Sequence, residues 1–173
     1  GNFIVHTEDP AGEWSEPIDV DQKGIDPSLF FDDDGAVYFT GVGITQFRVD
    51  PLTGETLSEK RQIWTGTGGK CPEGPHLYKI GGRYYLMLAE GGTEYGHMET
   101  IARADSPWGP FEPCPHNPIL SHRSSGSPIQ CTGHADLIED HRGQWWLVCL
   151  GTRPQGYTPG YHLGRETFLA PVA

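Results

Sequence analysis

Three titratable residues stand at equivalent positions of a repeated segment. Asp26, Glu73 and His134 each lie nine positions before a glycine that the surrounding sequence places in a tight turn. Two carboxyl groups and an imidazole are suited to proton transfer when they converge, because neighbouring charges make one group keep its proton while another gives it up. The repeated position therefore predicts a shared site for acid–base chemistry.

Glu73 has the surroundings of a general acid. Pro72 precedes it and Gly74 and Pro75 follow it, which fixes the direction of the backbone. A carboxyl group beside apolar and aromatic neighbours keeps its proton more readily, and a carboxylate from Asp26 would strengthen this by like-charge repulsion. Paired carboxyl groups in a chain rich in Trp and Tyr indicate carbohydrate chemistry, because glycosidic oxygens need protonation and sugar faces pack on aromatic rings.

The repeated segments have the pattern of β-hairpins. Each holds an apolar run, a polar turn with a glycine, and then an aromatic-rich run. This is the local signal for two antiparallel strands. The three segments are 26–35 followed by 37–39, 73–82 followed by 84–86, and 134–143 followed by 145–147.

A second repeat interleaves with the first and predicts the architecture. A Pro-x-Gly-x-aromatic pattern at 10–14 recurs at 107–111, each time after a strand-like run. A unit of roughly 45 to 50 residues with four short strands is typical of a β-propeller blade. The sequence therefore predicts an all-β propeller of about three to four blades. A two-sheet sandwich explains short strands equally well, but it gives no reason for a four-strand unit to recur.

Composition excludes several classes of protein. With 12 Lys and Arg against 23 Asp and Glu, the net charge is −11, and no basic cluster is available for a nucleic-acid partner. Scattered glycine and proline (24 and 15 residues) interrupt any long helix. No apolar run approaches the roughly 20 residues of a membrane span, so no membrane association is expected. The four cysteines include no Cys-x-x-Cys pair of the kind that binds zinc.

Five motifs in order along the chain resemble glycoside hydrolase family 43. They occupy residues 24–30, 73–78, 89–97, 133–137 and 163–167, and the resemblance covers nearly the whole sequence. The resemblance implies a five-bladed β-propeller of inverting β-xylosidases, α-L-arabinofuranosidases and arabinanases. A xylo- or arabino-oligosaccharide is then the expected partner, with the choice between xylose and arabinose left open.

The resemblance also implies roles for individual residues. Glu73 looks like the family's general acid, and Asp26 looks like the aspartate that modulates the pKa of that acid and orients it. For substrate binding, Arg165 looks like the arginine that hydrogen-bonds sugar hydroxyls, while Thr93 and Ile25 fall in segments that line the sugar pocket.

His134 looks like the family's histidine near the channel axis. It is expected to contact substrate, and in some members the equivalent residue holds a calcium ion through water. No cofactor is otherwise required by the resemblance.

One family feature has no counterpart in this sequence. The general base of the family is an aspartate in a Pro-Asp-Pro-like context on the innermost strand of the first blade, and the Asp9-Pro10 pair lies instead in the outer repeat. An inverting enzyme needs this base to activate water. We therefore expect residues 1–173 to comprise the end of blade one, blades two to four and the start of blade five at 165–171, and to lack turnover alone.

An incomplete ring is expected to associate with other copies or segments. Unpaired strand edges and an exposed core face favour self-association or pairing with the missing blades.

The alternative to an enzyme is a propeller that binds carbohydrate without catalysis, although a carboxyl pair favours the enzyme.

Two further residues of the third motif invite separate interpretations. His97 has the pattern of a structural histidine that is held by hydrogen bonds rather than of a ligand. Glu90 either faces the pocket or bonds to the Gly-Gly turn that follows it, and the sequence favours neither.

Overall fold

The computed structural model describes residues 1–155 and 160–172 and is built from β-strands. Across these residues it contains thirteen strands, and a 3-10 turn at Val42–Ile44 is the one helical element. The predicted lack of long helices is thus confirmed for this part of the chain. None of its helical segments is long and apolar enough to cross a membrane.

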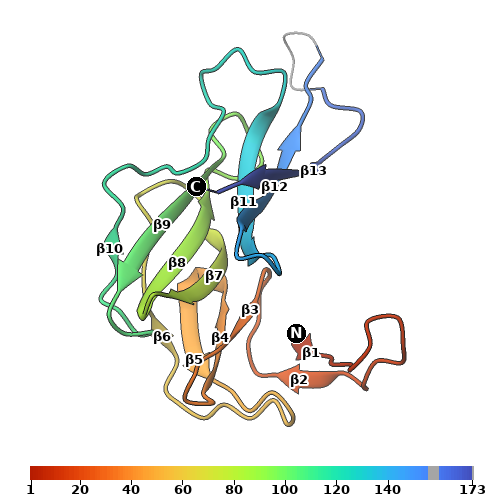
Figure 1. The fold of residues 1–173 in the computed structure, drawn as a ribbon, viewed down its shortest axis with the longest axis vertical. Helices are drawn as coiled ribbons and strands as arrows, with labels where there is room; N and C mark the ends of the chain where they lie inside the picture. The colour runs from red at the N-terminus through yellow and green to blue at the C-terminus, as the bar shows by residue number, and fades with distance from the viewer. Residues whose placement is uncertain (156–159, 173) are drawn as a thin grey trace.

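The strands form four antiparallel sheets that follow one another along the chain (Figure 1). In each of the last three sheets the strand order follows the sequence, so the first strand lies at one edge. The first sheet pairs β1 (Asn2–Ile4) with β2 (Ile18–Val20). The second contains β3 (Ser28–Phe31), β4 (Val37–Gly41), β5 (Thr45–Arg48) and β6 (Arg61–Gln62). The third contains β7 (Glu73–Ile80), β8 (Arg83–Glu90), β9 (Met98–Ala104) and β10 (Glu112–Pro113). The fourth contains β11 (Gln130–Glu139), β12 (Trp145–Thr152) and β13 (Glu166–Pro171).

The three predicted hairpins are confirmed as β3–β4, β7–β8 and β11–β12. Their turns contain Gly35, Gly82 and Gly143 with φ of 82°, 79° and 79°, a left-handed conformation that glycine adopts without steric cost. The second repeat corresponds to the connections that follow β1 and β9, which lead to β2 and β10. Both repeats therefore report the same four-stranded unit.

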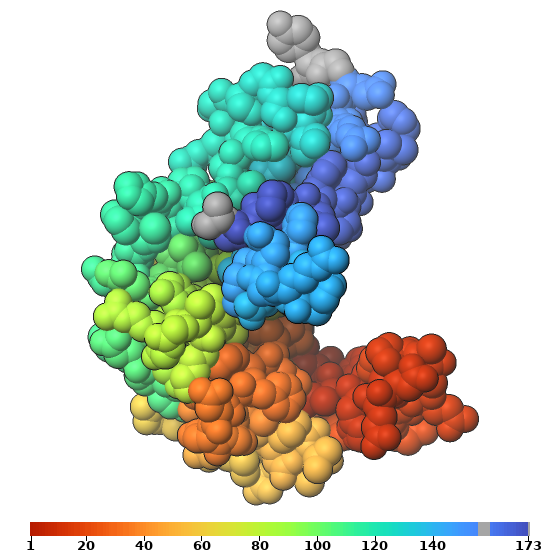
Figure 2. Space-filling view, viewed as in Figure 1, coloured from red at the N-terminus to blue at the C-terminus, as the bar shows by residue number. Residues whose placement is uncertain are grey.

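The sheets lie around an open arc, with the β1–β2 sheet at one end and the β11–β13 sheet at the other (Figure 2). A separate apolar cluster fills each junction between successive sheets, as expected for blades packed face to face. The first junction contains Ile4, Val20, Val37, Phe39, Phe47 and Val49. The second contains Ile44, Leu77, Tyr84, Leu86, Leu88, Ala102, Ala104 and Phe111. The third contains Met87, Ala135, Leu147 and Cys149.

The last strand departs from the expectation for residues 165–171. These residues were expected to start a fifth blade, but β13 pairs antiparallel with β12 over 166–171 and is the third strand of the fourth sheet. The physical reason is that a short apolar strand after a long connection has the same pattern whether it joins its own sheet or the next one. Its hydrogen-bonding partner is set by where the connection returns.

Buried charge ties the second sheet to the third. The Asp32 carboxylate accepts hydrogen bonds from Lys79 Nζ at 2.7 Å and from the Tyr84 hydroxyl at 2.6 Å. Burial opposes the charged carboxylate, but these hydrogen bonds outweigh it and lower the pKa of Asp32. The turn of the first hairpin is thereby fastened to β7 and β8.

Glu99 links the third sheet to the fourth, and its pKa is raised where that of Asp32 is lowered. Its side chain is fully buried, Oε2 accepts a hydrogen bond from the Ala135 amide at 2.9 Å, and Oε1 has no partner among the described residues. Burial raises the pKa of Glu99 well above its usual 4.5, and the neighbouring carboxylates of Asp136 and Glu90 add to the effect. A neutral Glu99 thus suits the junction better than a charged one.

We predict that Glu99→Gln stabilises the protein in a pH-dependent way. Because the folded-state pKa of Glu99 is raised, its contribution to stability is complete below its unfolded pKa and is lost as the pH rises through the folded pKa. Glutamine resembles the neutral carboxyl group at every pH. Thermal unfolding should show nearly equal midpoints near pH ~4 and a higher midpoint for the variant near pH ~8, by about 2–4 °C for each kcal/mol gained.

The exposed Glu112 on β10 provides the control, since its carboxylate pairs with Arg103 at the surface. Glu112→Gln should show no comparable rise between the two pH values. A Glu99→Gln midpoint that lies below that of the parent protein at the higher pH would contradict the assignment of a neutral Glu99.

Candidate active site

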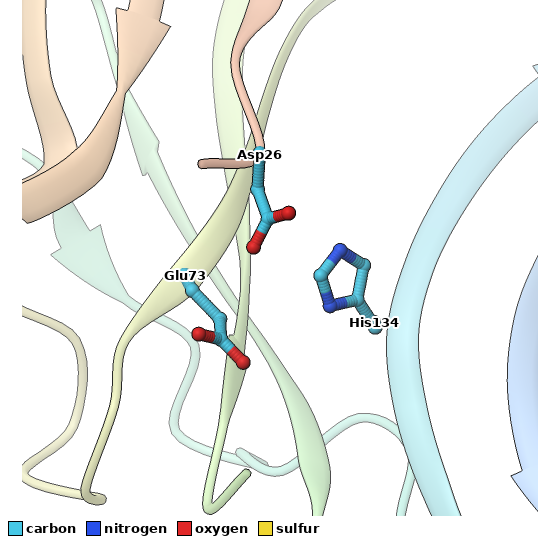
Figure 3. A group of neighbouring side chains, drawn as sticks. All are labelled: Asp26, Glu73 and His134. Carbon is cyan, nitrogen blue, oxygen red and sulfur yellow. The ribbon is translucent and has the colours of Figure 1, made fainter. Parts of the chain in front are cut away.

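The structure brings Asp26, Glu73 and His134 together. Asp26 lies two residues before β3, Glu73 is the first residue of β7, and His134 lies within β11. One ligand atom from each side chain lies within 4.8 Å of those of the other two, and all three residues are partly buried. Figure 3 shows the three side chains pointing toward one another, Glu73 and His134 from two different strands and Asp26 from the segment before β3. The three residues at the repeated position therefore lie close together, as the repeat predicted.

Hydrogen bonds between the first strands of successive sheets set this convergence. The Ser28 hydroxyl on β3 donates to the Pro75 carbonyl on β7 at 2.5 Å. The Tyr78 hydroxyl on β7 accepts from the Leu137 amide on β11 at 2.9 Å and donates to Asp136 Oδ1 at 2.5 Å. These contacts join β3 to β7 and β7 to β11 within a few residues of the three functional side chains.

Irregular backbone turns the side chains toward the shared site. The register of β7 against β8 shifts between Glu73 and His76, and that of β11 against β12 shifts again just after Gly133. Such bulges redirect side chains and are common next to active sites. Asp26 and His134 also have positive φ of 54° and 50°, which is uncommon for residues other than glycine and is typical of functional positions.

Gly74 gives the imidazole of His134 its place. A Cβ atom at this position would lie 2.8 Å from His134 Nε2, and the φ of Gly74 is +56°. Only glycine satisfies both the close approach and the backbone conformation. The ring of His134 therefore lies against the backbone of the residue that follows Glu73.

His76 is a neighbour of the site that the sequence analysis missed. Its Nδ1 lies 3.7 Å from Asp136 Oδ1. Burial lowers the pKa of His76, the carboxylates of Asp136 and Asp26 oppose this, and His134 adds to it. The signal that could have found it is its place in the same 73–78 motif as Glu73.

His97 is structural, as predicted. It is buried and its Nδ1 is hydrogen-bonded to the Cys131 carbonyl at 2.8 Å. Burial lowers the pKa of His97 against that hydrogen bond, and the charges of His134 and Arg165 add to the lowering. Arg165 itself is exposed and lies just before β13.

The remaining predicted binding residues lie outside the central cluster. Thr93 lines a cleft of about 340 Å³ together with Tyr95, Cys131 and Tyr161. Cys131 lies three residues before His134 on the same strand, β11. Ile25 precedes Asp26 and is 61% exposed, so its side chain is free to contact a ligand rather than the core.

The cluster does not make a calcium site by itself. Among the described residues, Asp26, Glu73 and His134 are the one group of three or more side chains that could hold a metal. Calcium takes six to eight oxygen ligands, so water molecules would have to complete a coordination shell that begins with the two carboxylates. The calcium expected near His134 through water stays a prediction, and the roles proposed below for these residues do not depend on it.

Known proteins of similar sequence and structure identify the family of this chain. All of residues 1–173 match the model of glycosyl hydrolases family 43. A non-reducing end α-L-arabinofuranosidase of Bacteroides ovatus is 49% identical over 99% of the chain, and a β-xylosidase of Bacillus subtilis is 40% identical over 97%. The crystal structure of a xylan β-1,4-xylosidase from Bacillus halodurans superposes with a TM-score of 0.94 at 36% identity, over 99% of the chain.

The chain spans about a third of the length of these relatives, namely 33%, 36% and 35% of each. The four sheets are accordingly part of a five-bladed β-propeller. With the family model matched from the first residue to the last, the chain belongs to glycosyl hydrolase family 43.

Proposed function

We propose that the protein hydrolyses pentose glycosides, β-xylosides or α-L-arabinofuranosides, and that Glu73 protonates the departing glycosidic oxygen. The observation that carries the proposal is the convergence of Asp26, Glu73 and His134 within 4.8 Å in a chain of this family. Relatives named as arabinofuranosidase and β-xylosidase support the substrate class. The alternative, a propeller that binds carbohydrate without cleaving it, uses the same site.

Asp26 acts on Glu73 rather than on water. Inverting glycosidases separate their acid and base by roughly 6.5 to 9.5 Å to leave room for the attacking water, and Asp26 and Glu73 are closer than this. At this separation Asp26 is placed to orient the Glu73 carboxyl group. The general base is then a carboxylate from outside residues 1–173.

In this proposal the sugar is bound by four further residues, His134, Arg165, Thr93 and Ile25. The ring of His134, held against Gly74, offers a nitrogen to a hydroxyl group, and Arg165 offers a charged fork of donors. The tyrosine-lined cleft beside Thr93 suits the faces of further sugar units.

Glu73→Gln should abolish most hydrolysis of phenyl β-xyloside or phenyl α-L-arabinofuranoside, with a fall of about 10²- to 10⁴-fold, because glutamine cannot donate the proton that the departing phenoxide needs. The assay uses the protein expressed from the longest reading frame that encodes residues 1–173. Glu112→Gln, the same change at an exposed position of β10, should retain activity. Undiminished hydrolysis by Glu73→Gln would remove Glu73 from the acid role, and oligosaccharide binding without turnover by the parent protein would favour the non-catalytic alternative.

Turnover and its stereochemistry should depend on a base from outside this chain. Residues 1–173 alone are expected to be inactive, while the longer protein should first release the sugar with inverted anomeric configuration. Proton NMR of the initial product distinguishes the two anomers. Retention of configuration would instead place Asp26 as a nucleophile, since retaining enzymes hold their carboxyl groups about 5 to 5.5 Å apart.

The open arc should be completed by the remaining sheets of a five-bladed ring. A hollow of about 310 Å³ between the first two sheets is lined mainly by apolar residues, including Phe3 and Leu29, and the nearby Phe31 is 64% exposed. Without covering sheets, residues 1–173 should self-associate, because exposed apolar faces and open strand edges favour pairing. Light scattering measures this directly, and a monomer at working concentration would contradict it.

A further inference from the structure

Glu90 is a buried carboxylate that the mechanism above does not use. It is the last residue of β8, it is 0% exposed, and the adjacent Ala89 pairs with Glu73. The sequence left open whether Glu90 faces the pocket or bonds to the following Gly-Gly turn. The structure shows a third arrangement, in which its carboxylate is bound by a loop that precedes Glu73.

Four hydrogen bonds hold the Glu90 carboxylate. Oε1 accepts from the Thr67 amide at 2.8 Å, the Thr67 hydroxyl at 3.1 Å and the Thr100 hydroxyl at 2.7 Å. Oε2 accepts from the Gly69 amide at 2.7 Å. Three of the four donors belong to the loop. All four are uncharged, so the carboxylate is a template in the sense that it holds the loop in one conformation through neutral donors rather than through an ion pair.

The loop is shaped to fit the carboxylate closely. A Cβ atom on Gly66 or on Gly69 would lie 2.7 Å from an oxygen of Glu90, and Gly66 also has a φ of +76°. Both positions therefore need glycine for the loop to approach this near. A change in the size or donor pattern of the Glu90 side chain must move the loop.

Movement of the loop reaches Glu73 directly. The Lys70 carbonyl accepts a hydrogen bond from the Gly91 amide at 2.7 Å, so the end of the loop is fastened beside Glu90. Between that anchor and Glu73 stand only Cys71, with a φ of 51°, and Pro72, whose ring fixes its φ. Few free rotations remain to absorb a displacement.

We propose that Glu90 is a positioning residue for the general acid, which sets the direction of the Glu73 carboxyl group through the 66–70 loop. The proposal rests on the proposed function, in which Glu73 protonates the leaving group. The positioning role predicts that loss of the Glu90 carboxylate impairs proton donation by Glu73 specifically, rather than substrate binding or folding in general.

The leaving group of the substrate distinguishes this role from a merely structural one. Phenyl β-xyloside needs a proton on its departing oxygen, whereas the 2,4-dinitrophenyl analogue releases a stable phenolate without one. Glu90→Gln keeps the volume of the side chain, but its NH2 group must face either the Gly69 amide or the Thr67 amide, donor against donor. We expect kcat to fall about 10- to 100-fold for the phenyl substrate, with little change in its KM and little change for the dinitrophenyl substrate.

Two further variants complete the experiment. These and Glu90→Gln are all made in the protein expressed from the longest reading frame that encodes the chain. Thr100→Val removes the one donor that lies on β9 rather than in the loop, and it should leave the leaving-group dependence unchanged. Gly69→Ala keeps Glu90 but pushes the loop away, and it should reproduce the selective loss. This variant also tests the proposal if Glu90→Gln fails to fold.

The outcomes separate this inference from the proposed function. Equal losses on both substrates for Glu90→Gln and Gly69→Ala would overturn the positioning role while leaving Glu73 as the acid. If Glu73→Gln itself showed no dependence on the leaving group, the proposed function would fail first. Selective loss in all three variants, with Thr100→Val unaffected, supports both.

Discussion

The structure depends on hydrogen bonds that run between the first strands of successive sheets. Ser28 binds the Pro75 carbonyl, and Tyr78 binds β11 at Leu137, so β3, β7 and β11 are held side by side although they belong to different sheets. Each sheet packs on the next through its own apolar cluster, which sets the distance between sheets but not their register. The polar links supply that register, because hydrogen bonds have direction where apolar contacts do not.

Much of the fold could be predicted because the repeat exposes it. Glycines at fixed distances from polar residues and aromatic runs define the hairpins, and their recurrence indicates a propeller blade rather than a sandwich. The partner of β13 could not be predicted, because the short apolar run at 168–171 is compatible with either neighbouring sheet. Pairing of this strand is decided by long-range contacts that leave no local pattern.

The candidate site was predictable to the extent that it lies on the repeat or in the motifs of the family. Asp26, Glu73 and His134 occupy one repeated position, and the structure brings them together. His76 and Glu99 were missed because their significance comes from burial and from partners on other strands. Glu90 could be noticed but not interpreted, because the loop residues that donate to it, Thr67 and Gly69, lie more than twenty positions earlier in the chain.

The contact between Gly74 and His134 limits which residues this protein can accommodate at position 74. The imidazole rests on bare backbone, with a would-be Cβ only 2.8 Å from Nε2, so the two positions form one steric unit. A larger residue at 74 would meet this ring and would also have to adopt a φ of +56°, so a smaller side chain at 134 would remove the clash but not the backbone strain. Redesign of this side of the site must therefore begin from a fixed glycine at 74.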